Sequence, residues 1–101
     1  MADLDPLVLS VDGGDPAVVR AEGELDVAGV SPLVSVLSDQ DGEVELDCSG
    51  LSFIDAAGVG AIVRAHHACE ARGTKLVLLD PSDAVVRVLR LVKLDTVLHI
   101  R

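Results

Sequence analysis

The sequence predicts an α/β fold with a mixed, largely parallel β-sheet, an N-terminal hairpin and about three to four covering helices. First, half of its 101 residues are hydrophobic, and Phe53 is the only aromatic one, so the core is aliphatic. Second, valine-rich runs that suit strands alternate with Ala- and Leu-rich runs that suit helices. Third, strand–helix–strand units follow the hairpin, which favours parallel strands. We expect one domain over residues 1–101.

The first two strands are expected to form the hairpin. Residues 7–11 are an apolar run, and residues 12–16 (DGGDP) are a strong turn signal. Residues 17–22 can then return as the second strand, and residues 23–26 lead out of it.

The first helix is predicted from four apolar residues at positions i, i+3, i+4 and i+7, namely Val30, Leu33, Val34 and Leu37. Its start has two interpretations. Ser31 can be the N-cap with Pro32 at the first helical position, or Asp26 can cap an earlier start. Residues 39–42 end the helix.

The middle of the chain predicts a strand, a turn and a long helix. Residues 43–47 alternate polar and apolar side chains, as a strand does, and residues 48–50 (CSG) are expected to form a turn. The Ala-rich residues 56–72 predict the second helix, with Gly73 as its C′ residue.

The last part of the chain predicts one more strand–helix unit. Residues 75–79 form a short, nearly continuous apolar run, which is typical of a strand buried on both faces. Ser82 is a good N-cap for a helix with an apolar stripe over residues 85–92. Residues 95–100 can add a short terminal strand.

Charge and composition exclude several classes of partner. The formal net charge of −9 argues against nucleic acid and anionic membranes, both of which need basic patches. It favours solubility or a partner with a basic surface. Residues 1–6 carry no export signal, and no apolar run is long enough for a membrane helix, so we expect a cytoplasmic protein without direct membrane contact. We expect no cofactor.

Residues 45–60 (ELDCSGLSFIDAAGVG) are the most specific stretch, with an acidic residue at the start of a glycine-containing helix. Here the chain resembles the STAS family, the sulphate transporter and anti-sigma factor antagonist domains. Residues 23–26 (GELD) and 78–82 (LLDPS) resemble other parts of the family pattern, in the same order. The resemblance implies a STAS-type fold and no enzymatic activity. It implies a monomer that binds an anti-sigma factor of the kinase-like ATP-binding fold and releases a sigma factor, which regulates transcription.

The sequence departs from the family at the phosphoacceptor position. Bacterial antagonists carry a serine after the acidic residue at the helix start, and a partner kinase phosphorylates it. Here this position is Ala56, followed by Ala57, and neither side chain has a hydroxyl group. Ser49 and Ser52 lie nearby but do not occupy the acceptor position. We therefore expect a domain that phosphorylation does not control at this site.

The resemblance also implies a partner-binding surface. It is expected to consist of two loops, at residues 23–27 and 49–55, and the exposed side of the first turns of the second helix. Its residues are Glu24, Asp26, Ser49, Asp55, Ala56, Ala57 and Gly58. Asp55 should also cap the helix, and Gly58 and Gly60 are most simply glycines that permit close packing.

The cysteines and histidines suggest weaker alternatives. Cys48 is either a partly exposed thiol with a redox role or a small buried residue. Cys69 is too far along the second helix for a disulfide with Cys48. His66, Cys69 and His99 make a metal site conceivable, but the usual zinc spacings are absent, so we expect none.

Two other functions stay open. Small STAS domains also serve as accessory subunits of lipid-transport ABC complexes. An enzyme that depends on the Cys48 thiol or on a nucleotide is the other alternative, although residues 58–60 (GVG) are a weak nucleotide signal.

Overall fold

A computed structural model describes residues 5–101, and these residues form one five-stranded sheet and three helices. In chain order the elements are β1 (Val8–Asp12), β2 (Ala17–Leu25), α1 (Val27–Ser38), β3 (Val44–Ile54), α2 (Ala56–Ala71), β4 (Leu76–Leu79), α3 (Asp83–Leu91) and β5 (His99–Ile100). The strand order in the sheet is β1-β2-β3-β4-β5. Only β1 runs antiparallel to its neighbour. The mixed, largely parallel sheet with an N-terminal hairpin is therefore confirmed.

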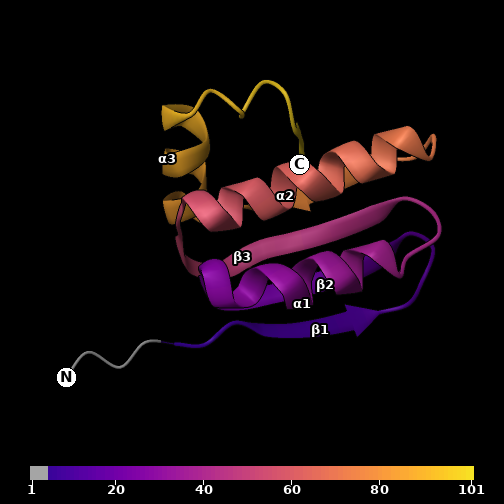
Figure 1. Ribbon diagram of the computed structural model, residues 1–101, viewed down its shortest axis with the longest axis horizontal. Helices are drawn as coiled ribbons and strands as arrows, with labels where there is room; N and C mark the ends of the chain where they lie inside the picture. Colours follow the sequence, from indigo (N-terminus) through magenta and orange to yellow (C-terminus); the bar gives the residue numbers. More distant parts are fainter. Residues whose placement is uncertain (1–4) are drawn as a thin grey trace.

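Helices α1 and α2 lie side by side on one face of the sheet, and α3 packs against β3 (Figure 1). In β2 and the first half of β3, buried apolar residues alternate with more exposed ones. Val19, Leu46 and Ile62 are fully buried in the aliphatic core between these layers. Most of the outward residues are polar, and Arg20 of β2 contacts Asp47 of β3 at 3.3 Å. One covered face and one polar face explain this alternation.

β3 is longer than predicted, and the expected turn at residues 48–50 is wrong. The strand continues to Ile54 because β2 also continues, to Leu25, and pairs with it in parallel. Gly50 lies opposite Glu22, and two shifts in register accompany the extension. The Cys-Ser-Gly sequence has turn composition, but the hydrogen bonds offered by a neighbouring strand override this local preference.

α1 begins at Val27, so Asp26 is its N-cap and the alternative start at Ser31 is wrong. The Asp26 Oδ1 atom accepts a hydrogen bond from the Ala28 backbone N–H at 3.0 Å. Pro32 consequently lies inside the helix, where it cannot donate a backbone hydrogen bond.

Predictions at the other helix ends are confirmed. Gly73 follows the C-cap of α2 with a φ of 74°, and its N–H bonds to the Glu70 carbonyl at 3.0 Å. Ser82 caps α3 through the Val85 N–H. Leu76, Val77 and Leu78 of β4 are all buried, as the continuous apolar run predicted. The terminal strand is shorter than expected, with only His99 and Ile100.

Residues 1–4, part of the stretch in which we expect no export signal, lie outside the described residues. Within residues 5–101, no helix combines the length and the apolar character that crossing a membrane requires.

Candidate partner-binding surface

Residues 45–60, which we call the signature segment, place the start of α2 at the ends of β2 and β3. Leu25 and Ile54, the last residues of these two strands, lie opposite each other in the sheet. The Asp55 N–H then donates to the Leu25 carbonyl oxygen at 3.3 Å. Both helices α1 and α2 therefore begin at the same edge of the sheet, immediately after paired strand ends.

Asp55 caps α2, as predicted. Its Oδ1 atom accepts a hydrogen bond from the Gly58 N–H at 2.9 Å, and its backbone is extended, with φ −112° and ψ −173°. This bond satisfies one of the free N–H groups of the first turn.

Gly58 is the close-packing glycine that the sequence predicted. A Cβ atom at this position would lie 2.6 Å from the Leu25 carbonyl oxygen and 2.8 Å from side-chain carbons of Leu25 and Ile54. The first turn of α2 can therefore lie directly on the end of β2 only with glycine here. The same prediction is wrong for Gly60, which is exposed and has open space where a Cβ atom would stand.

Ala56 is the first residue of α2 and is exposed, whereas Ala57 is half-buried. The first residue of α2 therefore presents a methyl group to solvent. Two larger apolar side chains are exposed nearby in the chain: Val27 is 75% exposed and Phe53 is 44% exposed. Val27 is the first residue of α1, and Phe53 is the penultimate residue of β3.

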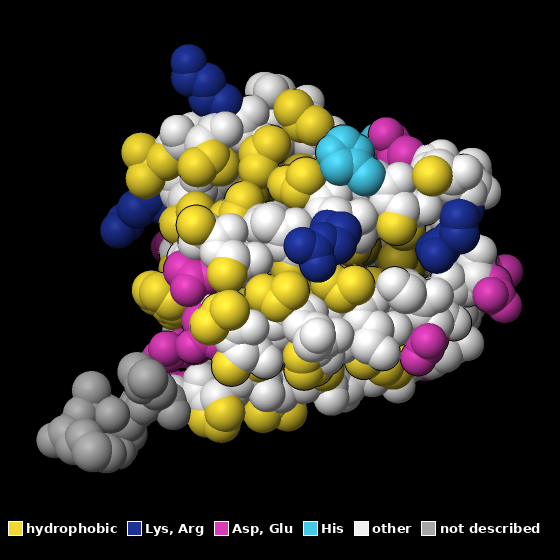
Figure 2. Space-filling model, in the orientation of Figure 1, with side chains coloured by type: hydrophobic (Ala, Val, Ile, Leu, Met, Phe, Trp, Pro, Cys, Tyr) yellow, Lys and Arg dark blue, Asp and Glu magenta, His cyan; other side chains and the backbone are white. Residues whose placement is uncertain are grey.

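We call Glu24, Asp26, Val27, Phe53, Asp55 and Ala56 the mouth surface. Figure 2 shows acidic side chains beside hydrophobic ones at the end of the molecule where α1 and α2 begin. Its acidic members Glu24, Asp26 and Asp55 are half-buried, and within residues 5–101 none of them forms an ion pair. Their charges are therefore available to a partner.

Sequence reasoning did not single out Val27 and Phe53. For Phe53, the signal was present: once residues 49–54 are read as strand, alternation with buried Ile54 turns Phe53 outward. Sequence reasoning also missed a groove of about 500 Å³ beside the mouth surface. The groove is lined by Asp5, Pro6, Leu7, Leu9, Glu24, Asp26, Ala28, Gly29 and Pro32.

Ser49 lies away from the mouth surface. Since residues 49–54 are strand and not loop, six residues at about 3.3 Å each separate Ser49 from Asp55 by roughly 20 Å. Ser49 is exposed and donates to Asp47 Oδ1 from its backbone N–H at 2.9 Å and from its hydroxyl at 2.7 Å. Burial alone would raise the pKa of the Asp47 carboxyl group. The hydrogen bonds from Ser49 and Arg20 and the Arg20 charge outweigh burial, so the pKa lies below its ordinary value.

The expectation of a partly exposed Cys48 thiol is wrong. Cys48 is fully buried in β3, and its thiol donates a hydrogen bond to the Leu46 carbonyl at 3.5 Å. Burial, with a smaller contribution from the Asp47 charge, raises the pKa of this thiol to about 12. Since the thiolate is the reactive form, this environment does not suit a redox switch and favours the small buried residue.

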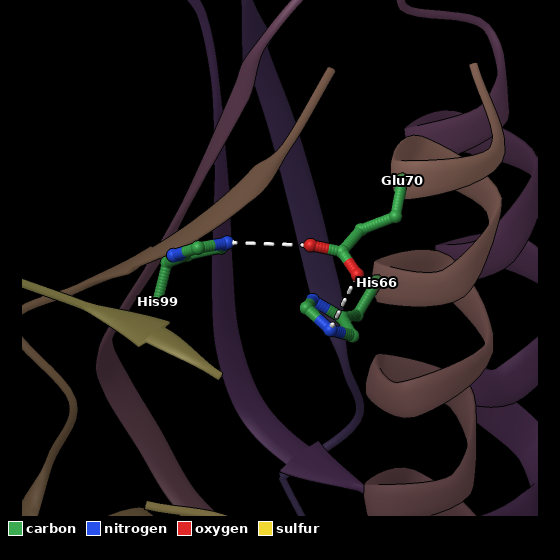
Figure 3. A group of neighbouring side chains, drawn as sticks. All are labelled: His66, Glu70 and His99. Atoms are coloured by element: carbon green, nitrogen blue, oxygen red, sulfur yellow. Dashed lines mark ion pairs between the residues drawn. The ribbon is translucent and has the colours of Figure 1, made fainter. Parts of the chain in front are cut away.

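The conceivable set of His66, Cys69 and His99 is only partly brought together. Cys69 is buried, and its sulfur accepts from the Arg72 guanidinium at 3.7 Å. His66 and His99 instead meet around Glu70, at the far end of α2 from Ala56 (Figure 3).

Comparison with known proteins agrees with this architecture. The family model described as "Mlab, STAS domain" matches residues 10–100. The anti-sigma-B factor antagonist of Staphylococcus aureus (strain NCTC 8325 / PS 47) is 30% identical over 86 residues, which cover 81% of this chain and 80% of that relative.

Two solved structures share the fold. The anti-sigma factor antagonist SpoIIAA in its unphosphorylated form superimposes with a TM-score of 0.78 at 24% identity, over 93% of this chain and 88% of that one. An anti-sigma factor antagonist from Mycobacterium paratuberculosis gives a TM-score of 0.80 at 19% identity, over 99% and 89% of the two chains. The matched family model covers nearly the whole sequence, and the chain therefore belongs to the STAS domain family, which includes the anti-sigma factor antagonists.

Proposed function

We propose that this domain is an anti-sigma factor antagonist that acts by binding and not by catalysis. As a cytoplasmic monomer, it would bind an anti-sigma factor of the kinase-like ATP-binding fold and so release a sigma factor for transcription. The observation that carries this proposal is the mouth surface, where acidic groups without ion pairs and exposed apolar side chains lie at the same paired strand ends and helix starts as Ala56, the residue matched to the family's acceptor position.

The composition of the mouth surface suits a protein partner with a basic rim. Val27 and Phe53 supply apolar area that binding would remove from water. Glu24, Asp26 and Asp55 would attract basic residues around that area, which raises the association rate more than the affinity. The net charge of −9 acts in the same direction over longer distances.

Ala56 makes the proposed binding state permanent at this position. A phosphate here would add about −1.5 to −2 charges. On this surface it would stand close in sequence to the Asp55 carboxylate and would have to lose water when the partner docks. Because alanine cannot be phosphorylated, the domain would bind its partner whether or not a kinase is active.

A phosphate-mimicking variant tests the proposal. The native protein and Ala56→Asp are used as baits in a pull-down from cells of the source organism, with partners identified by mass spectrometry. Ala56 is exposed, so the variant should fold, and circular dichroism checks this. The matched control is Ala68→Asp, which adds the same charge to another exposed alanine of α2, about 18 Å further along the helix.

We expect the native protein and Ala68→Asp to recover an anti-sigma factor and Ala56→Asp to recover at least about tenfold less, equivalent to about 1.4 kcal/mol. Equal recovery by all three would contradict the role of the mouth surface. Recovery of an ATPase subunit of a membrane lipid transporter in place of an anti-sigma factor would favour the function as a lipid-transport accessory subunit.

A further inference from the structure

Three potential metal ligands meet between α2 and the last strand. Glu70 lies one helical turn after His66, on the same face of α2, and His99 reaches the pair from β5 (Figure 3). The Glu70 Oε1 atom is 3.6 Å from His66 Nε2, and Glu70 Oε2 is 3.6 Å from His99 Nε2. One ligand atom from each residue lies within 4.8 Å of the others. A single carboxylate thus stands between two imidazoles.

His66 lacks the hydrogen bonds that a buried polar group needs. It is 4% exposed and is the one buried polar side chain among residues 5–101. Its Nδ1 atom is buried and has no hydrogen-bond partner in this part of the chain. Its Nε2 atom faces Glu70 at 3.6 Å, which is longer than a hydrogen bond. Neither ring nitrogen therefore has a hydrogen-bond partner among residues 5–101, which is unfavourable for a buried group, and the Nε2 atom that faces Glu70 is the one that an ion could bind.

We propose that His66, Glu70 and His99 bind one zinc-type divalent cation. Its ligands would be an imidazole nitrogen of each histidine and a Glu70 carboxylate oxygen, with water in the fourth position. Two imidazoles and one carboxylate are a ligand set that Zn²⁺ accepts, whereas Mg²⁺ and Ca²⁺ prefer oxygen ligands throughout.

Two of the three distances between ligand atoms are close to those of a tetrahedral site, and the third, between the two histidines, is within 4.8 Å. Bonds of about 2.0–2.1 Å place tetrahedral ligand atoms about 3.3–3.4 Å apart. The two contacts of 3.6 Å exceed this by a few tenths of an ångström. The side chains that have to move are the free ones: Glu70 is 52% exposed and His99 is 43% exposed, while His66 is held in the core. The buried histidine would be the fixed ligand, and the other two would close on the ion.

Such an ion would fasten the last strand to α2. β5 consists of only two residues, and it pairs with β4 through His99 and Ile100. Coordination of His99 would add a strong link where the sheet has few hydrogen bonds. His66 is ten residues after Ala56, about 15 Å along the helix, so this site is separate from the mouth surface and independent of the proposed function.

Direct metal binding tests the proposal. Full-length protein without a histidine tag, freed of metal with a chelator, is titrated with Zn²⁺ in competition with a chromophoric chelator. Co²⁺ is then used as a spectroscopic probe. We expect one ion per chain and a Co²⁺ spectrum with nitrogen and oxygen ligands but without thiolate charge-transfer bands, because both cysteines are buried and neither belongs to the cluster.

Matched variants assign the ligands. Glu70→Gln and His99→Ala change exposed side chains, so both should fold, and each should weaken Zn²⁺ binding by roughly tenfold or more. His67→Ala is the control: it removes the neighbouring histidine, whose ring centre is 5.4 Å from that of His66, and should leave the affinity unchanged.

Thermal unfolding gives a second readout. Zn²⁺ should raise the Tm of the native protein and of His67→Ala, and it should leave the Tm of a Glu70→Gln/His99→Ala double variant unchanged. The proposal is overturned if the native protein binds no Zn²⁺ in the competition assay, or if the double variant binds it as tightly as the native protein.

Discussion

The two halves of the signature segment behave differently although the sequence placed them on one surface. β3 ends the strand half at Ile54, and its first residues alternate between the core and the polar face, with Cys48 fully buried. The helix half begins at Asp55, which forms no ion pair among residues 5–101, and continues with the exposed Ala56. The strand half builds the sheet and adds only Phe53, next to its end, to the mouth surface, whereas the helix half adds Asp55 and Ala56 from its first two residues.

The difference follows from rise per residue. An extended chain advances about 3.3 Å per residue, and a helix advances only 1.5 Å. Ser49 is therefore carried far from the start of α2, while Asp55, Ala56 and Gly58 stay within one turn of each other. A contiguous run of residues that resembles a family pattern need not be one site, because its conformation decides which members meet.

The largest effect is expected from disturbing the packing of the helix half. Gly58→Ala would place a Cβ atom 2.6 Å from the Leu25 carbonyl oxygen, and backbone on both sides would have to move. We expect the free energy of unfolding to fall by about 2–3 kcal/mol, measured by urea denaturation monitored by circular dichroism.

Gly60→Ala is the matched control, two residues along the same helix. Open space surrounds that position, so alanine should raise the free energy of unfolding by about 0.5–1 kcal/mol through its higher helix propensity. Similar effects of the two substitutions would contradict the contact between the first turn of α2 and β2.

The buried Cys48 thiol of the strand half should make the free energy of unfolding fall at alkaline pH. The pKa of Cys48 is raised from 9.0 to about 12, so the folded protein holds this thiol neutral while the unfolded chain ionises it. The contribution to stability is complete below pH 9 and is lost as pH rises towards 12, by about 1.4 kcal/mol per pH unit. Urea denaturation between pH 8 and about pH 10.5 measures this loss.

Cys48→Ala provides the comparison for that measurement. Removal of the thiol should make the decline of unfolding free energy above pH 9 clearly shallower. An unchanged slope would mean that the Cys48 thiol ionises as easily in the folded protein as in the unfolded chain, and the strand half would then be more open than its burial indicates.

The fold was largely predictable because its signals are local and periodic. The hairpin turn, the apolar stripe of α1, the Ser82 cap and Gly73 each depend on neighbouring residues, and each was confirmed. The end of β3 was not predictable in this way. Whether residues 48–50 turn or continue depends on β2, which lies more than twenty residues earlier in the chain and supplies the partner strand.

The candidate site was predictable only in part, because only some of its features depend on neighbouring residues in the sequence. The caps at Asp26 and Asp55 and the close packing of Gly58 follow from short-range patterns. The meeting of Glu70 with His99 does not, because it joins a helix to a strand through the tertiary fold. Exposure of Val27 and Phe53 depends likewise on which elements cover them, and that is a property of the assembled layers.

The smallest effect is expected at Ser49, and it tests where the mouth surface ends. Ser49→Ala removes the hydroxyl bond of 2.7 Å to Asp47 but keeps the backbone bond of 2.9 Å. The free energy of unfolding should fall by about 0.5–1 kcal/mol at neutral pH, and the pKa of Asp47, measured by NMR titration, should rise towards its ordinary value. Partner recovery in the pull-down should equal that of the native protein, because Ser49 lies roughly 20 Å from Asp55 along the strand. A loss of recovery as large as that of Ala56→Asp would extend the surface along β3 as far as Ser49 and would restore the single site that the sequence suggested.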